Sequence, residues 1–300
     1  MKGEDRAGSL AERVESIFAK ACRLDVVAFK PGNVSLCADG HGMRAQDFLI
    51  SAKAAAPVLA MPSLTVGERI RTAIAATRAA VECNTNLGIV LLLAPIANAV
   101  LETGGDDLRA SLAEVLENLT VDDAKCCYAG IQLAEPAGMG AVAEQDVSRE
   151  PDANLREVMR LAHSRDMIAR QYVTDFEDVF CTGLPNLFRY RARWHSLAWA
   201  CSACYLSFLS LHPDSHVVRK HGSVVAEEVR QRAREVEKAF KACENPRRLR
   251  PVLTAFDDEL KSRGVNPGTS ADLTVASVSV LLLQERLHKN KVSTRLPQAR

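Results

Sequence analysis

The feature that most constrains the fold is an apolar segment, Ile89–Leu101, which directly follows the sequence Asn-Thr-Asn-Leu-Gly at residues 84–88. Its residues are apolar on every side, which predicts a helix that is buried all round. Pro95 interrupts the segment, and the apolar run from Leu87 is shorter than the roughly 20 residues that cross a bilayer. We therefore expect a core helix, and no membrane span.

The residues just before this helix are polar and include Asn84 and Thr85. The first backbone N–H groups of a helix have no partner inside it, and its dipole is positive at that end. A polar cluster there suits a phosphate or another anion. The alternative, that Asn84 or Thr85 simply caps the helix, fits the local sequence equally well.

Composition excludes several classes of protein. The 300-residue chain has a net charge of +1, so it lacks the basic field that nucleic-acid binding usually needs. Its N-terminal residues mix charges without an apolar core, which is not the pattern of a signal peptide. Nine cysteines, an odd number, fit reduced thiols better than a disulfide framework. We expect a cytoplasmic protein that binds neither nucleic acid nor membrane.

Helical spacing and capping signals predict an all-α fold, because sustained alternation of apolar and polar residues is missing from the sequence. Capping boxes begin at Ser9 and Thr65. We expect a single bundle-like domain over residues 1–300, with about ten helices around three apolar ones, and a loose tail over 289–300. The expected apolar helices cover residues 87–101, 188–211 and 271–287, an amphipathic stretch covers 155–180, and a charged helix covers 224–242.

Four polar clusters that contain Gly or Pro lie beside the apolar helices, over residues 30–47, 84–88, 214–222 and 266–273. Their cations suit a polyphosphate, and their carboxylates suit Mg²⁺ or acid–base chemistry. One cluster alone is more typical of helix capping, whereas four together favour a nucleotide-using transferase. The cations are Lys30, Arg219 and Lys220, and the carboxylates are Asp47, Asp214 and Asp272.

These clusters, in this order, resemble the triphosphoribosyl-dephospho-CoA synthase family. Its pattern has a basic-Pro-Gly loop followed by His and Asp, then Asn-Thr-His-basic-Gly before an apolar helix, then Asp-Thr…Arg-Gly-Gly, and finally Ser-Pro-Gly-Gly-x-Ala-Asp-Leu-Leu. The resemblance runs from about residue 20 to 285. The matching residues are Lys30-Pro31-Gly32 with His41 and Asp47, Asn84-Thr85-Asn86-Leu87-Gly88, Asp214-Ser215…Arg219-Lys220-His221-Gly222, and Asn266-Pro267-Gly268-Thr269-Ser270-Ala271-Asp272-Leu273.

The chain departs from this pattern at four positions. Asn86 replaces the family His, Leu87 replaces a basic residue, and Thr269 replaces a Gly. Ser35 stands near a position where members commonly have Asp. The variant motifs resemble a divergent branch of archaea and one-carbon-metabolising bacteria. The departures leave the acceptor as the least defined part of the reaction.

The resemblance implies an all-α enzyme that cleaves ATP at its N-glycosidic bond, releases adenine and passes the 5-triphosphoribosyl group to a hydroxyl of dephospho-CoA or a related cofactor precursor. Two alternatives are a kinase or ribosyl transferase of pterin or furan cofactor synthesis, and a non-catalytic nucleotide-binding homologue. A homodimer is compatible with either.

The resemblance also implies roles for individual residues. We expect Asp47, Asp214 and Asp272 to be catalytic, and Mg²⁺ to be held by Asp47 and Asp214. We expect one pocket to be lined by Lys30, Asn33, Asp47, Asn84, Asn86, Asp214, Arg219 and Asp272. The further binding residues expected are Gly32, Ser35, His41, Thr85, Lys220, Gly268 and Thr269.

Overall fold

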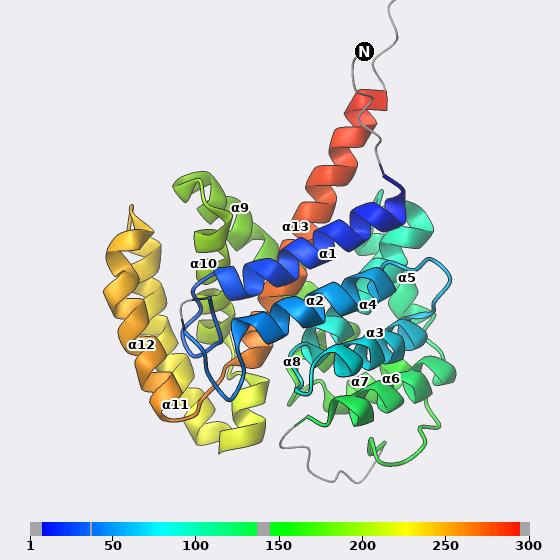
Figure 1. Ribbon diagram of the computed structural model, residues 1–300, viewed down its shortest axis with the longest axis horizontal. Helices are drawn as coiled ribbons and strands as arrows, with labels where there is room; N and C mark the ends of the chain where they lie inside the picture. The colour runs from blue at the N-terminus through cyan, green and yellow to red at the C-terminus, as the bar shows by residue number, and fades with distance from the viewer. Residues whose placement is uncertain (1–7, 37, 137–144, 295–300) are drawn as a thin grey trace, which may run out of the picture.

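The computed structural model describes residues 8–36, 38–136 and 145–294, and in these ranges the protein is all-α, as the sequence predicts (Figure 1). The helices of the first half are α1 (Leu10–Val27), α2 (Ala45–Leu59), α3 (Val66–Ala80), α4 (Leu87–Thr103), α5 (Leu108–Glu117) and α6 (Val121–Ala134). Those of the second half are α7 (Leu155–Ala162), α8 (Met167–Val173), α9 (Leu184–Trp194), α10 (Leu197–Leu211), α11 (Ser215–Ala242), α12 (Arg250–Ser262) and α13 (Gly268–Thr294).

Several helices begin where the sequence signals place them. Ser9 caps α1 and Thr65 caps α3, each in a reciprocal capping box with a Glu three residues later. Thr120 caps α6 in the same way, with Asp123 as its partner. These signals are predictable because both partners lie within one helical turn.

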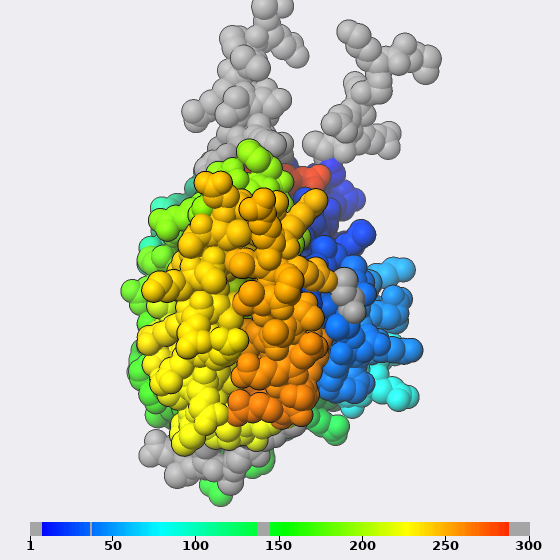
Figure 2. All heavy atoms as spheres, turned by 90° about the vertical axis from the view of Figure 1, so that its left-hand side faces the viewer, coloured from blue at the N-terminus to red at the C-terminus, as the bar shows by residue number. Residues whose placement is uncertain are grey.

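The three apolar helices pack together, as expected, with α13 between the other two. α13 packs against both α4 and α10, and it also packs along α1. In Figure 1 α13 rises through the middle of the molecule behind α1. The α11 and α12 helices cover one side of this core, and Figure 2 shows their surface.

Two long helices expected from the sequence are broken in the structure. The stretch 155–180 divides into α7, α8 and the start of a π-helix (Asp178–Gly183), because the carboxylate of Asp166 caps a new helix at the N–H groups of Ile168 and Ala169. The stretch 188–211 divides at His195, whose φ of 49° is left-handed. These breaks raise the helix number to thirteen within the described ranges, above the ten or so expected.

Two helix ends also differ from expectation. α11 begins at Ser215, well before residue 224, and continues past a non-helical Gly222 with a φ of 86°. α13 continues to Thr294, so the loose tail expected from residue 289 is helical there, and residues 295–300 lie outside the described ranges.

Within the described ranges, no single helix is both long and apolar enough to cross a membrane. The bent pair of α4 and α5 passes the same test by length and composition alone.

Candidate active site

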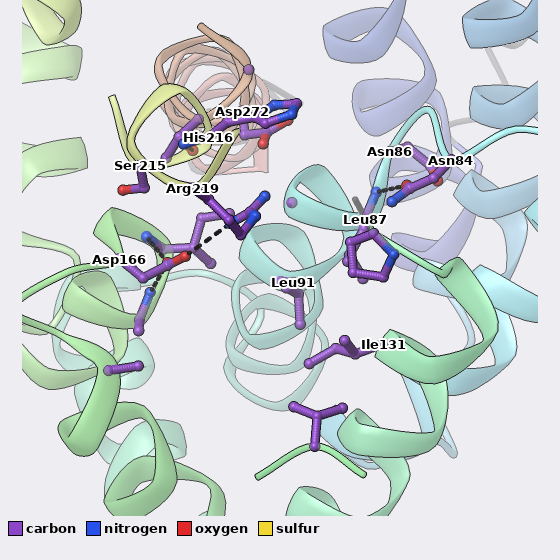
Figure 3. A pocket seen from close by; sticks show the side chains of 18 of the residues that line it. Asn84, Asn86, Leu87, Leu91, Ile131, Asp166, Ser215, His216, Arg219 and Asp272 are labelled. Carbon is purple, nitrogen blue, oxygen red and sulfur yellow. Dashed lines mark hydrogen bonds and ion pairs between the residues drawn. The ribbon is translucent and has the colours of Figure 1, made fainter. Parts of the chain in front are cut away.

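The first turns of four helices meet around one cavity of about 980 Å³ (Figure 3). The helices are α4, α8, α11 and α13, and residues from the first turn of each line the cavity. A helix start carries the positive end of the helix dipole, and its first backbone N–H groups have no partner within the helix. The convergence of four such ends makes this cavity a favourable place for an anion.

Of the four helix starts, that of α4 is the least well capped. Asn86 occupies the capping position but its side chain makes no capping hydrogen bond. Leu87 N–H donates to Asn84 Oδ1 at 3.3 Å, a long bond (Figure 3). At Gly88, a Cβ atom would lie 2.0 Å from Asp272 Oδ2, so only glycine permits this approach of the two helices.

Cations lie on the α8–α11 side of the cavity. Arg219, in the second turn of α11, is partly buried and lies with a guanidinium nitrogen 3.6 Å from Asp166 Oδ2 (Figure 3). Lys220 and Arg165 also line the cavity and are exposed. Flexible cations at a rim together with helix N-termini form a common arrangement for holding phosphate groups.

Among the acidic residues that line the cavity, Asp272 has the surroundings most typical of a reactive carboxyl group. It lines the cavity from the second turn of α13 and has no hydrogen-bond or ion-pair partner among the described residues. Burial, followed by repulsion from Asp25 and Asp214, raises the pKa of Asp272 well above its usual value. This shift favours the protonated form of Asp272.

Asp25 and Lys30 form a buried ion pair behind this wall. Asp25, in the last turn of α1, is 8% exposed and lines the cavity, whereas Lys30 is 1% exposed. The Lys30 ammonium also lies 5.9 Å from the centre of the Tyr205 ring. The Lys30 side chain is therefore held in the protein interior, whereas the sequence predicted that it contacts phosphate.

Two amide side chains, Asn33 and Asn86, also line the cavity. Asn33 Nδ2 donates to Asn266 Oδ1 at 2.5 Å, and Asn86 Nδ2 donates to Thr77 Oγ1 at 3.0 Å. The Oδ1 atoms of Asn33 and Asn86 are buried without a partner in the part of the chain that the structure describes. Because unsatisfied buried acceptors are unfavourable, these two oxygens are suited to accept hydrogen bonds from a ligand.

His216 is held neutral beside the cations. Its ring packs against Gly268, where a Cβ atom would lie 2.5 Å from Nδ1. Burial, followed by repulsion from Arg219 and Lys220, lowers the pKa of His216 to about 3. His41 also lines the cavity, its Nε2 lies 2.8 Å from the Gly32 carbonyl oxygen, and burial lowers its pKa.

The other end of the cavity is apolar. Figure 3 shows Leu91 and Ile131 at this end, away from Asp272, His216 and Arg219. The remaining apolar side chains of this wall come from α6, α7 and α8, and include Val158, Met159 and Ile168.

Most residues predicted from the sequence line this cavity: Asn33, His41, Asn84, Thr85, Asn86, Arg219, Lys220, Gly268, Thr269 and Asp272. The residues that line it do not include five others: Lys30, Gly32, Ser35, Asp47 and Asp214.

Each of these five has another position. Asp47 accepts a hydrogen bond from Arg44 N–H in the capping box of α2, and Gly32 N–H donates to Asp257 at 2.7 Å. Asp214 is fully buried, caps α11 and joins it to α13 through Ser270. Ser35 is 4% exposed.

Sequence reasoning missed Asp25, Arg165, Asp166 and the apolar wall. For Asp25 a signal was present, since it follows Ala21 by one turn on the apolar face of the first helix, where a carboxylate is unusual. The apolar wall had no such signal, because apolar residues on α6 and α7 are typical of any helix core.

Comparisons with known proteins identify the family. A crystal structure from Archaeoglobus fulgidus, provisionally described as a triphosphoribosyl-dephospho-CoA synthase, is similar with a TM-score of 0.63 and 24% identity, over 79% of this chain and 98% of that chain. A search of curated proteins gives no match. The family model for ATP:dephospho-CoA triphosphoribosyl transferase matches residues 11–291. Because this match covers nearly the whole chain, the protein belongs to that family of ATP-dependent enzymes, which transfer the triphosphoribosyl group of ATP to dephospho-CoA.

Proposed function

We propose that the cavity is the active site for this transfer and that Asp272 is the acid that protonates the departing adenine. One observation supports the proposal above others: Asp272 is a carboxyl group on the cavity wall with no partner among the described residues. Burial raises its pKa, and this favours the protonated form that a general acid needs. A neutral acid is also what a leaving group that departs with an electron pair requires.

The reaction balances with this assignment. The bond between C1′ and N9 of ATP breaks, and its electron pair leaves with adenine, which takes the Asp272 proton. The acceptor hydroxyl oxygen forms the new bond to C1′ and loses its own proton. Cleavage of an N-glycosidic bond passes through an oxocarbenium-like centre, so protonation of the leaving group lowers the barrier.

The triphosphate would lie against the starts of α4, α11 and α13, where Arg219 and Lys220 line the cavity. Charge-assisted bonds to these cations add to the dipoles of the helix N-termini. The acceptor oxygens of Asn33 and Asn86 would receive hydrogen bonds from hydroxyl or amino groups of the substrates. Each of these assignments is part of the proposal.

Mg²⁺ would accompany the triphosphate. Within the described ranges, no group of three or more His, Cys, Asp or Glu side chains is placed to hold a metal ion. Mg²⁺ is commonly held by substrate phosphates with one or two carboxylates, and Asp166 on the cavity wall fits that role. Asp47 and Asp214 fit it less well, because neither of them lines the cavity. When bound, the ion would reduce the charge of the triphosphate.

A cytoplasmic location and a homodimer complete the proposal. The eight cysteines of the described ranges are free thiols, which fits a reducing compartment. The homodimer is tested by light scattering of the purified protein, where a mass of one chain would contradict it.

The test of the proposal is Asp272→Asn, assayed as adenine released from Mg-ATP with and without dephospho-CoA. We expect kcat to fall on the order of 10²–10⁴-fold, with little change in ATP affinity. The amide matches the neutral carboxyl in shape, so the thermal unfolding temperature should equal or exceed that of the wild type.

Asp258→Asn, an exposed aspartate on α12, is the matched control and should keep full activity. A wild-type protein that binds ATP but releases no adenine with any acceptor would instead be a non-catalytic homologue. An active Asp272→Asn enzyme would remove Asp272 from the chemistry.

A further inference from the structure

We propose that Asp25 is the base that accepts the proton of the acceptor hydroxyl, with Lys30 as its fixed counter-ion. The inference rests on the proposed function and adds a second catalytic residue to it. It assigns a role to a buried ion pair that binding of the triphosphate does not require.

The geometry of the pair leaves one oxygen of Asp25 for a substrate. Asp25 Oδ1 binds the Lys30 ammonium, and Asp25 Oδ2 has no partner among the described residues. Asp25 lines the cavity, whereas Lys30 does not, so the carboxylate lies between the lysine and the substrate space. A base must be within hydrogen-bond reach of the proton that it removes, and this position provides that access.

The cavity wall that carries the Asp25–Lys30 ion pair also carries a second carboxyl group, that of Asp272. α1 packs along α13, and the negative charge of Asp25 is among the causes that raise the pKa of Asp272. One carboxylate is thus paired with a cation, while the surroundings of the other favour its protonated form. Two carboxyl groups in such different surroundings are the usual arrangement for a base and an acid in one site.

Electrostatic arguments speak against a purely structural role for the Asp25–Lys30 ion pair. A buried ion pair adds little stability over apolar residues of the same size. An extra carboxylate beside a triphosphate site also repels the substrate. The Asp25 carboxylate on the cavity wall is therefore unfavourable for ATP binding, and a role in proton transfer explains its position.

The other titratable groups around Asp25 are uncharged at neutral pH. Burial raises the pKa of the Cys22 and Cys201 thiols to about 12 and that of the Tyr205 hydroxyl well above its usual value. Lys30 and Asp272 are then the groups that set the electrostatic environment of Asp25.

The proton transfer closes the balance of the reaction. The acceptor O–H bond breaks, its proton moves to Asp25 Oδ2, and the oxygen lone pair forms the bond to C1′ of the ribose. Asp272 gives its proton to adenine in the same turnover. After product release, a proton passes from Asp25 to solvent and one returns to Asp272, so that both groups are reset.

The test compares Asp25→Asn with the double variant Asp25→Asn/Lys30→Met. The single variant leaves a buried ammonium without a counter-ion and is expected to unfold at a lower temperature. The double variant removes both charges, so its unfolding temperature should recover. We expect dephospho-CoA-dependent adenine release to stay at least on the order of 10²-fold below wild type in both, with ATP affinity retained.

The pH profile separates a base from a support for folding. Wild-type kcat should fall on the acid side of its pH profile, as expected of a reaction that needs an unprotonated base, and the residual activity of the double variant should lack that fall. A matched control is Arg191→Met/Glu285→Gln, which removes an ion pair between α9 and α13 whose residues do not line the cavity. This control should keep wild-type kcat.

Recovery of kcat in the double variant would overturn the inference and reduce the pair to a structural one. Loss of activity in Asp272→Asn together with full activity in the double variant would leave the proposed function in place. A wild-type enzyme that releases no adenine would remove the proposed function, and this inference with it.

Discussion

Asp214 and Asp272 lie at the starts of two neighbouring helices, and their surroundings are opposite. Asp214 caps α11 and accepts hydrogen bonds from the N–H groups of His216 and Val217 and from both the N–H and the hydroxyl of Ser270. Asp272 faces the cavity and has no partner among the described residues. Burial is the largest cause raising the pKa of each.

The difference shows that burial alone does not indicate a reactive carboxyl. Two of the four hydrogen bonds of Asp214 cap α11 and the two from Ser270 hold α11 against α13, and together they leave no room for a substrate. The proton of Asp272 stays available because nothing in the described chain competes for it. Hydrogen-bond satisfaction therefore separates a structural aspartate from a chemical one.

The largest effect that tests this comparison is on stability, in Asp214→Ala. Four hydrogen bonds are lost, but His216 N–H keeps Thr269 Oγ1 as an acceptor at 3.2 Å, so three donors are left unsatisfied. Because each unsatisfied buried donor costs about 1–3 kcal/mol, we expect the free energy of unfolding to fall by about 3–9 kcal/mol. Urea unfolding measures it. Ser270→Ala, which removes only the hydroxyl bond, should cost about 1 kcal/mol. A stable but inactive Asp214→Ala protein would place Asp214 in the chemistry instead.

A smaller effect concerns pH and His216, which links the two helix starts. Its pKa is lowered to about 3 in the folded protein, so between about pH 3 and 6.5 the unfolded chain binds more protons than the folded one. Stability should therefore rise with pH across this window, by at most about 5 kcal/mol. His216→Gln should flatten that rise, whereas exposed His163→Gln should leave it unchanged. Equal slopes in all three proteins would show that His216 titrates normally.

A third effect concerns the cations of the cavity. Arg219→Ala should weaken ATP binding by about 1.5–3 kcal/mol, which is roughly a 10- to 150-fold rise in Kd, because a charged hydrogen bond to phosphate is lost. Isothermal calorimetry measures the change. Arg189→Ala, an exposed arginine on α9, is the control and should bind ATP like wild type. Unchanged affinity in Arg219→Ala would move the triphosphate away from α11.

The smallest effect is expected for Asp47→Asn. Asp47 accepts a hydrogen bond from Arg44 N–H at the start of α2 and does not line the cavity. The variant should lose less than about 1 kcal/mol of stability, as partial loss of a helix cap does, and should release adenine at the wild-type rate. A strong loss of turnover would return Asp47 to the catalytic group that its sequence position suggested.

The parts of the fold that sequence predicted correctly depend on neighbours along the chain. Ser9 with Glu12 and Thr65 with Glu68 form caps within one turn, so four residues contain the whole signal. The apolar helix after Gly88 is equally local, since its composition alone requires burial. The breaks at Asp166 and His195 were missed because each competes with a continuous helical pattern on both sides.

The site was predictable to the extent that helix starts are. Asn84, Arg219 and Asp272 lie at or near such starts and line the cavity as the motifs suggested. Lys30 does not line the cavity, because its ammonium forms an ion pair with Asp25 of α1 in the protein interior. Which carboxylate would pair and which would stay free depends on the packing of α1 against α13, and that packing has no signature in either segment.

The position of Asp272 has a consequence for the newly made protein. A chain emerges from the ribosome N-terminus first, and α13 is the last helix of the described ranges to appear. The groups proposed to hold the triphosphate on α4 and α11 are made earlier, but the proposed acid arrives only when α13 threads between α4 and α10. An incomplete chain would therefore be unable to cleave ATP at its N-glycosidic bond, and transferase activity would begin only when α13 completes the core.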